Sequence, residues 1–578
     1  MFNKVRKYLH KIEITLTALL MILVGSLTWS LTMVKSGIVY GYGMGFWGPN
    51  GHDGVWHIAV AKSLARGTWE MPIFQGATIK NYHIGYDLIL SIIHKISTIP
   101  VVTLYFQIMP PLISLGIGYF AYKFIKKWKG EKQALWSLFF IYFGGGFGWV
   151  VTLFRSGIFG GESMFWSQQA ISTLINPPFA LSLLFVFAGL NYLYEGLKQN
   201  EKKYLVTAAI LFGALAQIKI YAAILVLGGL FFIGFWKLIK REGLAVIKVF
   251  MGSLTIALVL TLPFLDLSAN TFVFRPFWFL QTMVGSPDRL FWLKLASAMM
   301  NYQLAGNWLK YGLATIVSFF IFWYGNLGTR FIWEIDIADK LVKKRKINYI
   351  ETLIVFMILM GVLIPMLFVQ SGTPWNTIQF FYYSLALSGI LAGVGMAKWF
   401  GNISIPILHS IGICIVVLVT IPTTLSTLWL HYLPGRPPAM IGKSELEALT
   451  FLKQQPDGIV LTVPFDRDAA IAEQDNPPRP LYLYESTAYV SAFSDKQVFL
   501  EDEVNLNITG YDWSERKLAV QKFFETDNTN KVGEFLKEND IKYIYLVDFQ
   551  KEDFPTDTSF TEKIFDNDEV VIYKTNLL

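Results

Sequence analysis

The sequence has a single cysteine and few charged residues for its length. Its 578 residues are 53% hydrophobic and 16% aromatic, and only 16% are Asp, Glu, Lys or Arg. A soluble chain of this size needs more charge to cover its surface. The one cysteine, Cys414 in an apolar run, excludes a disulfide framework and a thiolate metal cluster. The composition therefore predicts a polytopic membrane protein in a lipid bilayer.

The excess of basic residues does not indicate a nucleic-acid partner. The formal net charge is +7, but the Lys and Arg residues occur in short clusters between apolar runs, the pattern that marks cytoplasmic loops. Beyond the N-terminus, these clusters lie at 123–132, 198–203, 237–241 and 330–346. We expect each of them on the cytoplasmic side of a cell membrane and no binding of nucleic acid.

The apolar runs predict about eleven membrane-spanning helices. The first, about 14–34, is too long for a signal peptide and lacks a cleavage site, so the N-terminus is expected to be cytoplasmic. Further spans are expected near 100–122, 133–152, 177–196, 244–264, 307–324, 349–369, 377–398 and 403–427. Residues 204–236 are too few for two full spans and predict a short hairpin whose tip, Lys219, faces outside. Segment 84–98 is predicted to be an interfacial helix.

The C-terminal region changes in character at about residue 431. It becomes polar, begins with several prolines, and continues with helix-like and strand-like pieces that predict a soluble α/β domain over 431–578. Because the span count is odd and the N-terminus is inside, this domain is expected to be extracytoplasmic. It would lie on the same side as the first outer loop, 36–98, which we assign to the transmembrane catalytic domain over 1–430.

The first outer loop contains the clearest candidate for chemistry. Asp53 and His57 are four residues apart at the start of a predicted helix, so both lie on one face, where a carboxylate held by an imidazole would form a general base. An equally good interpretation is that Asp53 caps the helix and His57 packs beneath it. A third is a divalent metal held by His52, Asp53, His57 and His83, although no zinc spacing is present and no cofactor is otherwise indicated.

His83 and Asp87 repeat the four-residue spacing at the start of the next apolar segment. A charge at the interface is costly unless it is paired or faces a polar cavity. We therefore expect these two residues to help position a substrate, or alternatively to form a satisfied pair that fixes the entry of the helix.

Several stretches resemble a known superfamily over residues 1 to about 425. They are the acidic residue early in the first loop, Asn176-Pro177-Pro178 opening a span, GALAQIKIYA and TPWNTIQFFYY. Together with the many spans and the outer C-terminal domain, they are similar to bacterial members of the GT-C superfamily of membrane glycosyltransferases. The resemblance implies transfer of a sugar from a polyprenyl-phosphate-linked donor to an extracytoplasmic glycan, lipid or protein acceptor, with Asp53 as the catalytic base. The Asp-Glu or Asp-x-Asp pair of that superfamily is absent, because Gly54 follows Asp53.

A polyprenyl-phosphate donor requires cations at the outer interface beside an apolar groove. Lys219, next to Tyr221, and Arg275, within an aromatic run, are the candidates for binding it. The alternatives are that Lys219 only snorkels at the end of a short span and that Arg275 anchors an aromatic belt. Asn376 and Gln379 are candidates for binding sugar hydroxyls, or else they cap or bridge helices.

Two other classes of protein would share some of these features. A transporter or flippase of lipid-linked substrates would also need cations and a groove, but such proteins normally have repeats and charges near mid-membrane. A non-catalytic scaffold would leave Asp53 dispensable. The run Gly144–Gly148 is not followed by the Lys-Ser/Thr of a phosphate loop and predicts close helix packing or a kink.

Overall fold

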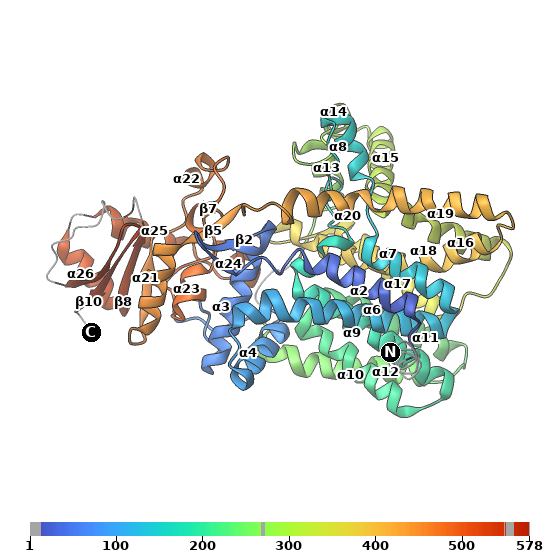
Figure 1. Cartoon of the computed structure of the whole chain (residues 1–578), viewed down its shortest axis with the longest axis horizontal. Helices are drawn as coiled ribbons and strands as arrows, with labels where there is room; N and C mark the ends of the chain where they lie inside the picture. The colour runs from blue at the N-terminus through green and yellow to red at the C-terminus, as the bar shows by residue number, and fades with distance from the viewer. Residues whose placement is uncertain (1–12, 267–271, 527, 548–549, 551–559, 577–578) are drawn as a thin grey trace. The chain divides into compact units, whose positions relative to one another are not determined.

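The computed structural model describes residues 13–266, 272–526, 528–547, 550 and 560–576. The described residues form two compact units, whose elements are labelled in Figure 1. The first, here called the helical unit, comprises the described parts of 1–32, 110–263 and 270–433. The second, here called the mixed unit, comprises those of 33–109, 264–269 and 434–578. The boundary at 433 lies close to the predicted one, but the first outer loop groups with the C-terminal region instead of with the spans.

Long apolar helices dominate the chain, as its composition predicts. Eight described helices are long and apolar enough to cross a membrane: Val101–Lys129, Pro177–Gln199, Ile220–Ile239, Ala245–Phe264, Trp308–Val342, Tyr349–Leu367, Pro374–Gly401 and Pro406–Tyr432. The pair α7 (Glu131–Phe143) and α8 (Gly148–Ser156), bent by 44°, gives a ninth. With the short helices α2 (Leu16–Ser30) and α10 (Lys202–Ile218), each predicted span coincides with a helix. A multi-span helical fold is thus confirmed, and the count of eleven crossings stays a prediction.

The remaining elements of the helical unit are short or lie within these longer helices. They include η3 (Ala170–Ile175), α11 (Ile220–Ile239), α12 (Ala245–Thr261), β3 (Phe272–Phe274), α13 (Trp278–Gly285), α14 (Leu293–Leu304), α15 (Trp308–Leu327), η5 (Gly328–Phe331), α16 (Ile332–Val342), α17 (Tyr349–Leu367), β4 (Phe368–Gln370), η6 (Pro374–Ile378), α18 (Gln379–Gly401), α19 (Pro406–Thr420) and α20 (Pro422–Thr427). Helix α6 spans Met109–Lys129 and α9 spans Pro177–Gln199. The Asn-Pro-Pro tripeptide opens α9 because the Asn176 side chain accepts a hydrogen bond from Phe179 N at 3.0 Å and Pro177 occupies the first helical position.

Helix α10 runs parallel to α12. Gly213 lies against Ile256, and one turn further along both helices Gln217 Nε2 donates to Leu260 O at 2.8 Å. Contacts that advance in the same direction on both helices require parallel axes.

Helix α11 runs in the opposite direction along α12. The rings of Phe231 and Phe250 are 5.4 Å apart, and the later residue Gly234 lies against the earlier residue Ile247. Helices α10 and α11 are therefore antiparallel, and the predicted hairpin is confirmed. Its tip is Lys219, whose extended backbone (φ −160°, ψ 104°) separates the two helices.

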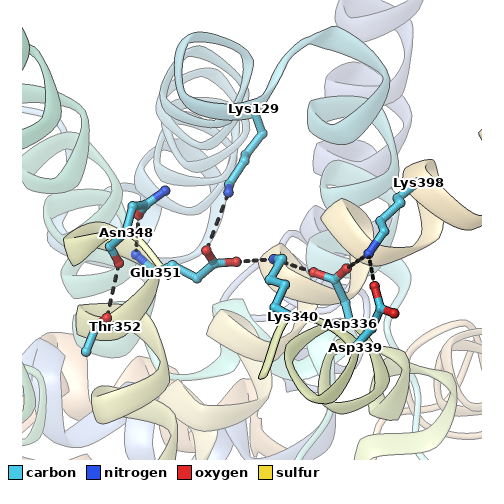
Figure 2. A network of polar contacts seen from close by, with 8 residues as sticks. All are labelled: Lys129, Asp336, Asp339, Lys340, Asn348, Glu351, Thr352 and Lys398. Carbon is cyan, nitrogen blue, oxygen red and sulfur yellow. Dashed lines mark hydrogen bonds and ion pairs between the residues drawn. The ribbon is translucent and has the colours of Figure 1, made fainter. Parts of the chain in front are cut away.

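A buried network of ion pairs joins helix ends far apart in the sequence, as Figure 2 shows. Glu351 at the start of α17 pairs with Lys129 at the end of α6, at 3.6 Å, and with Lys340 of α16. Asp336 of α16 pairs with Lys340 at 2.5 Å and with Lys398 of α18 at 2.8 Å. The two carboxylates are only 2% and 3% exposed, so this network fixes the four helix ends to one another.

The same end of the helical unit gathers the other basic clusters. Lys127 pairs with Glu195 of α9 at 3.1 Å, just before the cluster at 198–203. Lys237 of α11 lies 3.7 Å above the ring of Tyr349 at the start of α17. Lysines of all four predicted basic clusters thus lie at one end of the helical unit, as the predicted topology requires, and the tip of the α10–α11 hairpin lies at the other end.

The glycine run forms a close helix contact, as predicted. An added Cβ would lie 2.4 Å from Phe140 O at Gly144 and 2.7 Å from Gly325 O at Gly146, so no side chain fits. The run also accommodates Arg330, which is 1% exposed and donates to Leu327 O at 2.9 Å. Arg330 is therefore a packed residue at the α15–α16 junction, and its assignment to a cytoplasmic basic loop is wrong.

The mixed unit contains two four-stranded sheets. The first has the order β1 (Val39–Tyr40), β2 (Gly43–Phe46), β5 (Ala439–Gly442), β7 (Arg479–Pro480), and the second β6 (Ile459–Thr462), β8 (Ile541–Val547), β10 (Val570–Thr575), β9 (Thr561–Asp566). In the first, β2 of the outer loop pairs antiparallel with β5 of the C-terminal region. In the second, β6 and β8 are parallel and the other pairs antiparallel. This pairing explains why the outer loop belongs to this unit.

Eight described α-helices complete the mixed unit, together with the short helix α5 (Val101–Thr103). They are α3 (Asp53–Arg66), α4 (Gly85–Ser97), α21 (Lys443–Gln454), α22 (Arg467–Ala472), α23 (Tyr489–Ser494), α24 (Glu503–Thr509), α25 (Ser514–Glu525) and α26 (Thr529–Glu538), with the start of α6. Helix α4 confirms the predicted helix at 84–98, and it packs against α3. An α/β arrangement is present in the C-terminal region, and its extracytoplasmic location stays a prediction.

Candidate active site

The predicted base lies in the first turn of α3. His52 is the N-cap residue and Asp53 the first helical residue, so the interpretation of Asp53 as the cap is wrong. The His52 Nδ1 atom lies 3.0 Å from Asp53 Oδ1. The Asp53 side chain is 45% exposed and that of His52 15% exposed. The Asp53 carboxylate is thus oriented by His52 and is still accessible to solvent, and therefore to a substrate.

A second carboxylate holds the other side of the His52 ring. Its Nε2 atom lies 3.6 Å from Oδ1 of Asp502, the buried N-cap residue of α24. Burial alone would lower the pKa of His52, but the hydrogen bonds and charges of Asp502 and Asp53 outweigh it and raise the pKa well above its usual value. The two carboxylates, one buried and one accessible, therefore favour the protonated form of the His52 ring between them.

His57 does not orient Asp53 as predicted. Its Nδ1 atom hydrogen-bonds to Asp87 Oδ1 at 2.8 Å, and within the described residues it has no hydrogen bond to Asp53. His57 is 3% exposed and Asp87 fully buried. The carboxylate–imidazole pairs are thus His52–Asp53 and His57–Asp87, whereas the four-residue spacing predicted Asp53–His57 and His83–Asp87. The arrangement corresponds to the alternative of a satisfied pair that fixes a helix entry.

Aromatic rings enclose the His57–Asp87 pair. The His57 ring stacks on Tyr105 at 5.8 Å and meets Tyr86 edge-on at 6.2 Å. Burial, with a smaller contribution from the Asp87 charge, raises the pKa of Tyr86 well above its usual value. His83 is half-buried and stacks on Tyr82 at 4.5 Å. His83 thus lies beside this aromatic cluster, where substrate positioning remains a proposal.

The loop does not assemble a metal site. Among the described residues, no group of three or more His, Cys, Asp or Glu side chains could hold a metal ion. Of the four predicted ligands, His57 bonds to Asp87, which is outside the set, whereas His52 lies between Asp53 of the set and Asp502. A divalent metal in this loop therefore stays a prediction.

A second polar cluster lies in the helical unit and contains four of the predicted substrate-binding residues. Lys219 is 3% exposed, and its Nζ atom lies 5.7 Å from the ring centre of Tyr221. Tyr221 donates to Gln370 Oε1 at 3.4 Å, and Asn376 Nδ2 donates to the same oxygen at 2.8 Å. Gln379 in turn donates to Asn376 Oδ1. Because Lys219 is buried, its interpretation as a snorkelling residue is wrong.

Gln370 is the member of this cluster that the sequence did not reveal. It ends strand β4, whose partner strand β3 brings Phe272 opposite it. Arg275 follows β3, with its backbone N donating to Leu367 O at 2.9 Å, and its side chain is exposed. The β3–β4 pairing therefore brings Arg275 to the same short sheet as Gln370, which its sequence position alone did not predict.

Comparisons with solved structures identify the fold. The archaeal oligosaccharyltransferase AglB from Archaeoglobus fulgidus, in complex with an inhibitory peptide and a dolichol-phosphate, matches with a TM-score of 0.51 and 12% identity over 92% of this chain and 69% of that one. The same enzyme in the apo form matches with a TM-score of 0.52, 11% identity and the same coverage. Its complex with Zn and sulfate matches with a TM-score of 0.50 and 15% identity over 91% of this chain and 68% of that one. No protein-family model and no curated protein matches the sequence.

These neighbours are archaeal, whereas the sequence motifs resemble bacterial members of the superfamily. At such low identity the likeness concerns the arrangement of the chain. The chain therefore has a fold similar to that of the Archaeoglobus fulgidus oligosaccharyltransferase.

Proposed function

We propose that this protein is a membrane glycosyltransferase that moves a sugar from a polyprenyl-phosphate-linked donor to an extracytoplasmic acceptor. The observation that carries the proposal is Asp53, an accessible carboxylate held by His52 at the start of α3, in a chain with a glycosyltransferase fold. The similar archaeal enzyme has been solved with a dolichol-phosphate and, in another structure, with a tethered acceptor peptide containing an NVT sequon. These molecules suggest the donor and acceptor classes to test first.

In the proposed reaction, Asp53 accepts the proton of the acceptor nucleophile as that atom attacks the anomeric carbon of the donor sugar. The bond from this carbon to the phosphate oxygen breaks, and the polyprenyl phosphate leaves with the bonding electrons. His52 is proposed as a positioning residue: its hydrogen bond holds the Asp53 carboxylate at 3.0 Å, and Asp502 Oδ1 lies 3.6 Å from the other ring nitrogen. His57 is proposed to contribute by packing the first turn of α3 against α4.

We propose that the donor phosphate binds at Lys219. A buried lysine beside Tyr221 and three amide side chains offers one positive charge and several hydrogen-bond donors, the groups that a phosphate and its attached sugar require. His83 and Arg275 are also proposed to bind substrate, because His83 lies beside the aromatic cluster and Arg275 lies next to the β3–β4 sheet. The N-terminus is proposed to be cytoplasmic, which would place the C-terminal domain outside.

The proposal is tested by following a radiolabelled sugar on a polyprenyl-phosphate carrier. The full chain is reconstituted in vesicles, and label leaving the lipid phase is measured with and without a peptide containing Asn-Val-Thr. Asp53→Asn keeps the shape of the side chain and an oxygen for the His52 bond but removes most of its basicity, so turnover should fall by about 10²- to 10⁴-fold. The matched control is Asp495→Asn, which changes a half-buried carboxylate of the same unit that pairs with Lys62 and Lys453.

The outcome also separates the rival classes. A flippase would move the labelled lipid between leaflets without releasing label from it. A scaffold would show no turnover, and Asp53→Asn would then change nothing. Release of label that is unaffected by Asp53→Asn would refute the assignment of the base while leaving the transferase class intact.

A further inference from the structure

The C-terminal part of the mixed unit contains a cavity of about 50 Å³. This is several times the space that one water molecule needs, which is roughly 10–15 Å³. Five carboxyl side chains line it: Asp466, Glu485, Glu501, Asp502 and Glu503. None of the described lining residues is Lys, Arg or His. The ionisable side chains of the described lining are therefore carboxyl and phenol groups.

Four of the five carboxylates already have a structural partner. Glu501 and Asp502 accept hydrogen bonds from backbone N–H groups at the starts of α23 and α24, and Asp466 does so at α22. Glu503 pairs with Lys517 at 2.7 Å. These contacts explain why the four carboxylates are present, so the four do not by themselves indicate a ligand.

Two further lining residues, Glu485 and Thr487, have no such structural contact within the described chain. Glu485 is exposed and has no hydrogen bond or ion pair with any other described residue. Thr487 is only 4% exposed, and its buried Oγ1 atom has no hydrogen-bond partner in the described chain. A buried hydroxyl without a partner is unfavourable, so its oxygen is available to accept a hydrogen bond from a ligand in the cavity.

Aromatic rings complete the lining. Tyr489 and Tyr545 both line the cavity, with their ring centres 6.5 Å apart and their planes inclined at 71°, and Tyr482 lies on the wall as well. Faces of tyrosine rings attract cations, and the combination of such rings with a carboxylate and a hydroxyl acceptor suits an alkylammonium group. A carboxylate or phosphate ligand would meet no basic side chain among the described lining residues.

We propose that this cavity binds the ammonium group of a primary amine, such as a lysine side chain, with Glu485 supplying the countercharge and Thr487 accepting a hydrogen bond. The inference goes beyond the proposed transfer reaction and does not depend on it. It places a bound amine next to Asp502, the residue that supports His52.

The probes are Nα-acetyl-lysine amide and Nα-acetyl-norleucine amide, which differ in the ammonium group. Binding of each to the full-length protein in lipid nanodiscs is measured by saturation-transfer NMR titration. The lysine compound should bind at least about 10-fold more tightly than the norleucine compound. Glu485→Gln and Thr487→Val should each weaken lysine binding severalfold. The control Glu447→Gln removes the same charge from an exposed position of α21 outside the cavity and should leave binding unchanged.

Equal binding of the two probes would overturn the proposal, as would lysine binding that neither variant at the cavity weakens. An equal loss in Glu447→Gln would show a general attraction of cations to an acidic surface and would overturn it too. Activity is not a readout in this experiment, so a failure of the proposed transfer function leaves the result interpretable.

Discussion

His57 and Asp87 are 30 residues apart in the sequence, and a 2.8 Å hydrogen bond joins their side chains across helices α3 and α4. Both are almost completely buried. This pair connects the helix that begins with Asp53 to the helix that follows the outer loop, and so it holds the first turn of α3 in place.

Removing the Asp87 carboxylate should destabilise the mixed unit. Asp87→Ala leaves a cavity and a buried imidazole without its acceptor, a loss of about 3 kcal/mol in the free energy of unfolding. Asp87→Asn keeps an acceptor oxygen and should cost about 1 kcal/mol. Thermal unfolding of the full chain in detergent measures both. An Asp87→Ala variant as stable as the wild type, but unable to bind donor or acceptor, would instead support the predicted role in substrate positioning.

The sequence predicted the helices of this protein better than the contacts of its polar residues. Apolar runs and basic clusters predicted where the long apolar helices lie because lipid exposure imposes a long-range pattern on the sequence. The four-residue spacing of Asp53 and His57 correctly placed both on one helix. It could not show that His57 faces a different helix, because the direction of a side chain relative to other elements is set by packing.

The residues that the sequence did not reveal come from distant segments. Asp502 lies in the acidic run Glu501–Glu503, which has no local feature that connects it with His52. Gln370 joins Tyr221 and Asn376 only through the β3–β4 pairing. In contrast, Lys219, Asn376 and Gln379 were found because polar residues within apolar segments are costly and stand out.

Lys219 should matter for the lipid-linked donor and little for the acceptor. Lys219→Gln removes the charge but keeps a hydrogen-bond donor, and a charged hydrogen bond to phosphate is worth roughly 1.5–3 kcal/mol, so affinity for a fluorescent polyprenyl phosphate should fall by about 10- to 100-fold. The control is Lys202→Gln, an exposed lysine at the opposite end of the same helix α10. Equal affinities of the Lys219→Gln variant and the wild type would contradict donor binding at the hairpin tip.

The ion network in Figure 2 should be a major determinant of stability in the helical unit. Asp336→Ala removes the buried carboxylate that joins Lys340 to Lys398, leaving Lys340 with Glu351 alone and Lys398 with Asp339 alone, and should cost about 3 kcal/mol. Lys343→Ala breaks only the pair with Asp339, in which the lysine is 55% exposed, and should cost less than about 1 kcal/mol. Thermal unfolding in the same detergent compares the two variants. Similar losses in both would show that burial adds nothing to this network.

The C-terminal domain should lose stability as the pH rises. Glu445 of α21 is 2% exposed and accepts a hydrogen bond from Tyr545 at 3.3 Å. Burial raises its pKa from 4.5 to about 8, with a further contribution from the charge of Glu569. The folded state therefore binds a proton more tightly than the unfolded state does. The resulting stabilisation is fully present below the unfolded pKa of 4.5 and is lost as the pH rises through 8.

Glu445→Gln removes this titration and should flatten the pH dependence. Hydrogen–deuterium exchange of α21 and β8, corrected for the intrinsic exchange rate, measures local stability in the full chain at pH 5.5 and 8.5. Wild-type protein should lose protection between these values, and the variant should lose less. Glu447→Gln, two residues away on the exposed face of the same helix, should behave as the wild type. If Glu445→Gln and the wild type lost protection equally, the pH dependence would have to come from another group, and the assignment to Glu445 would be refuted.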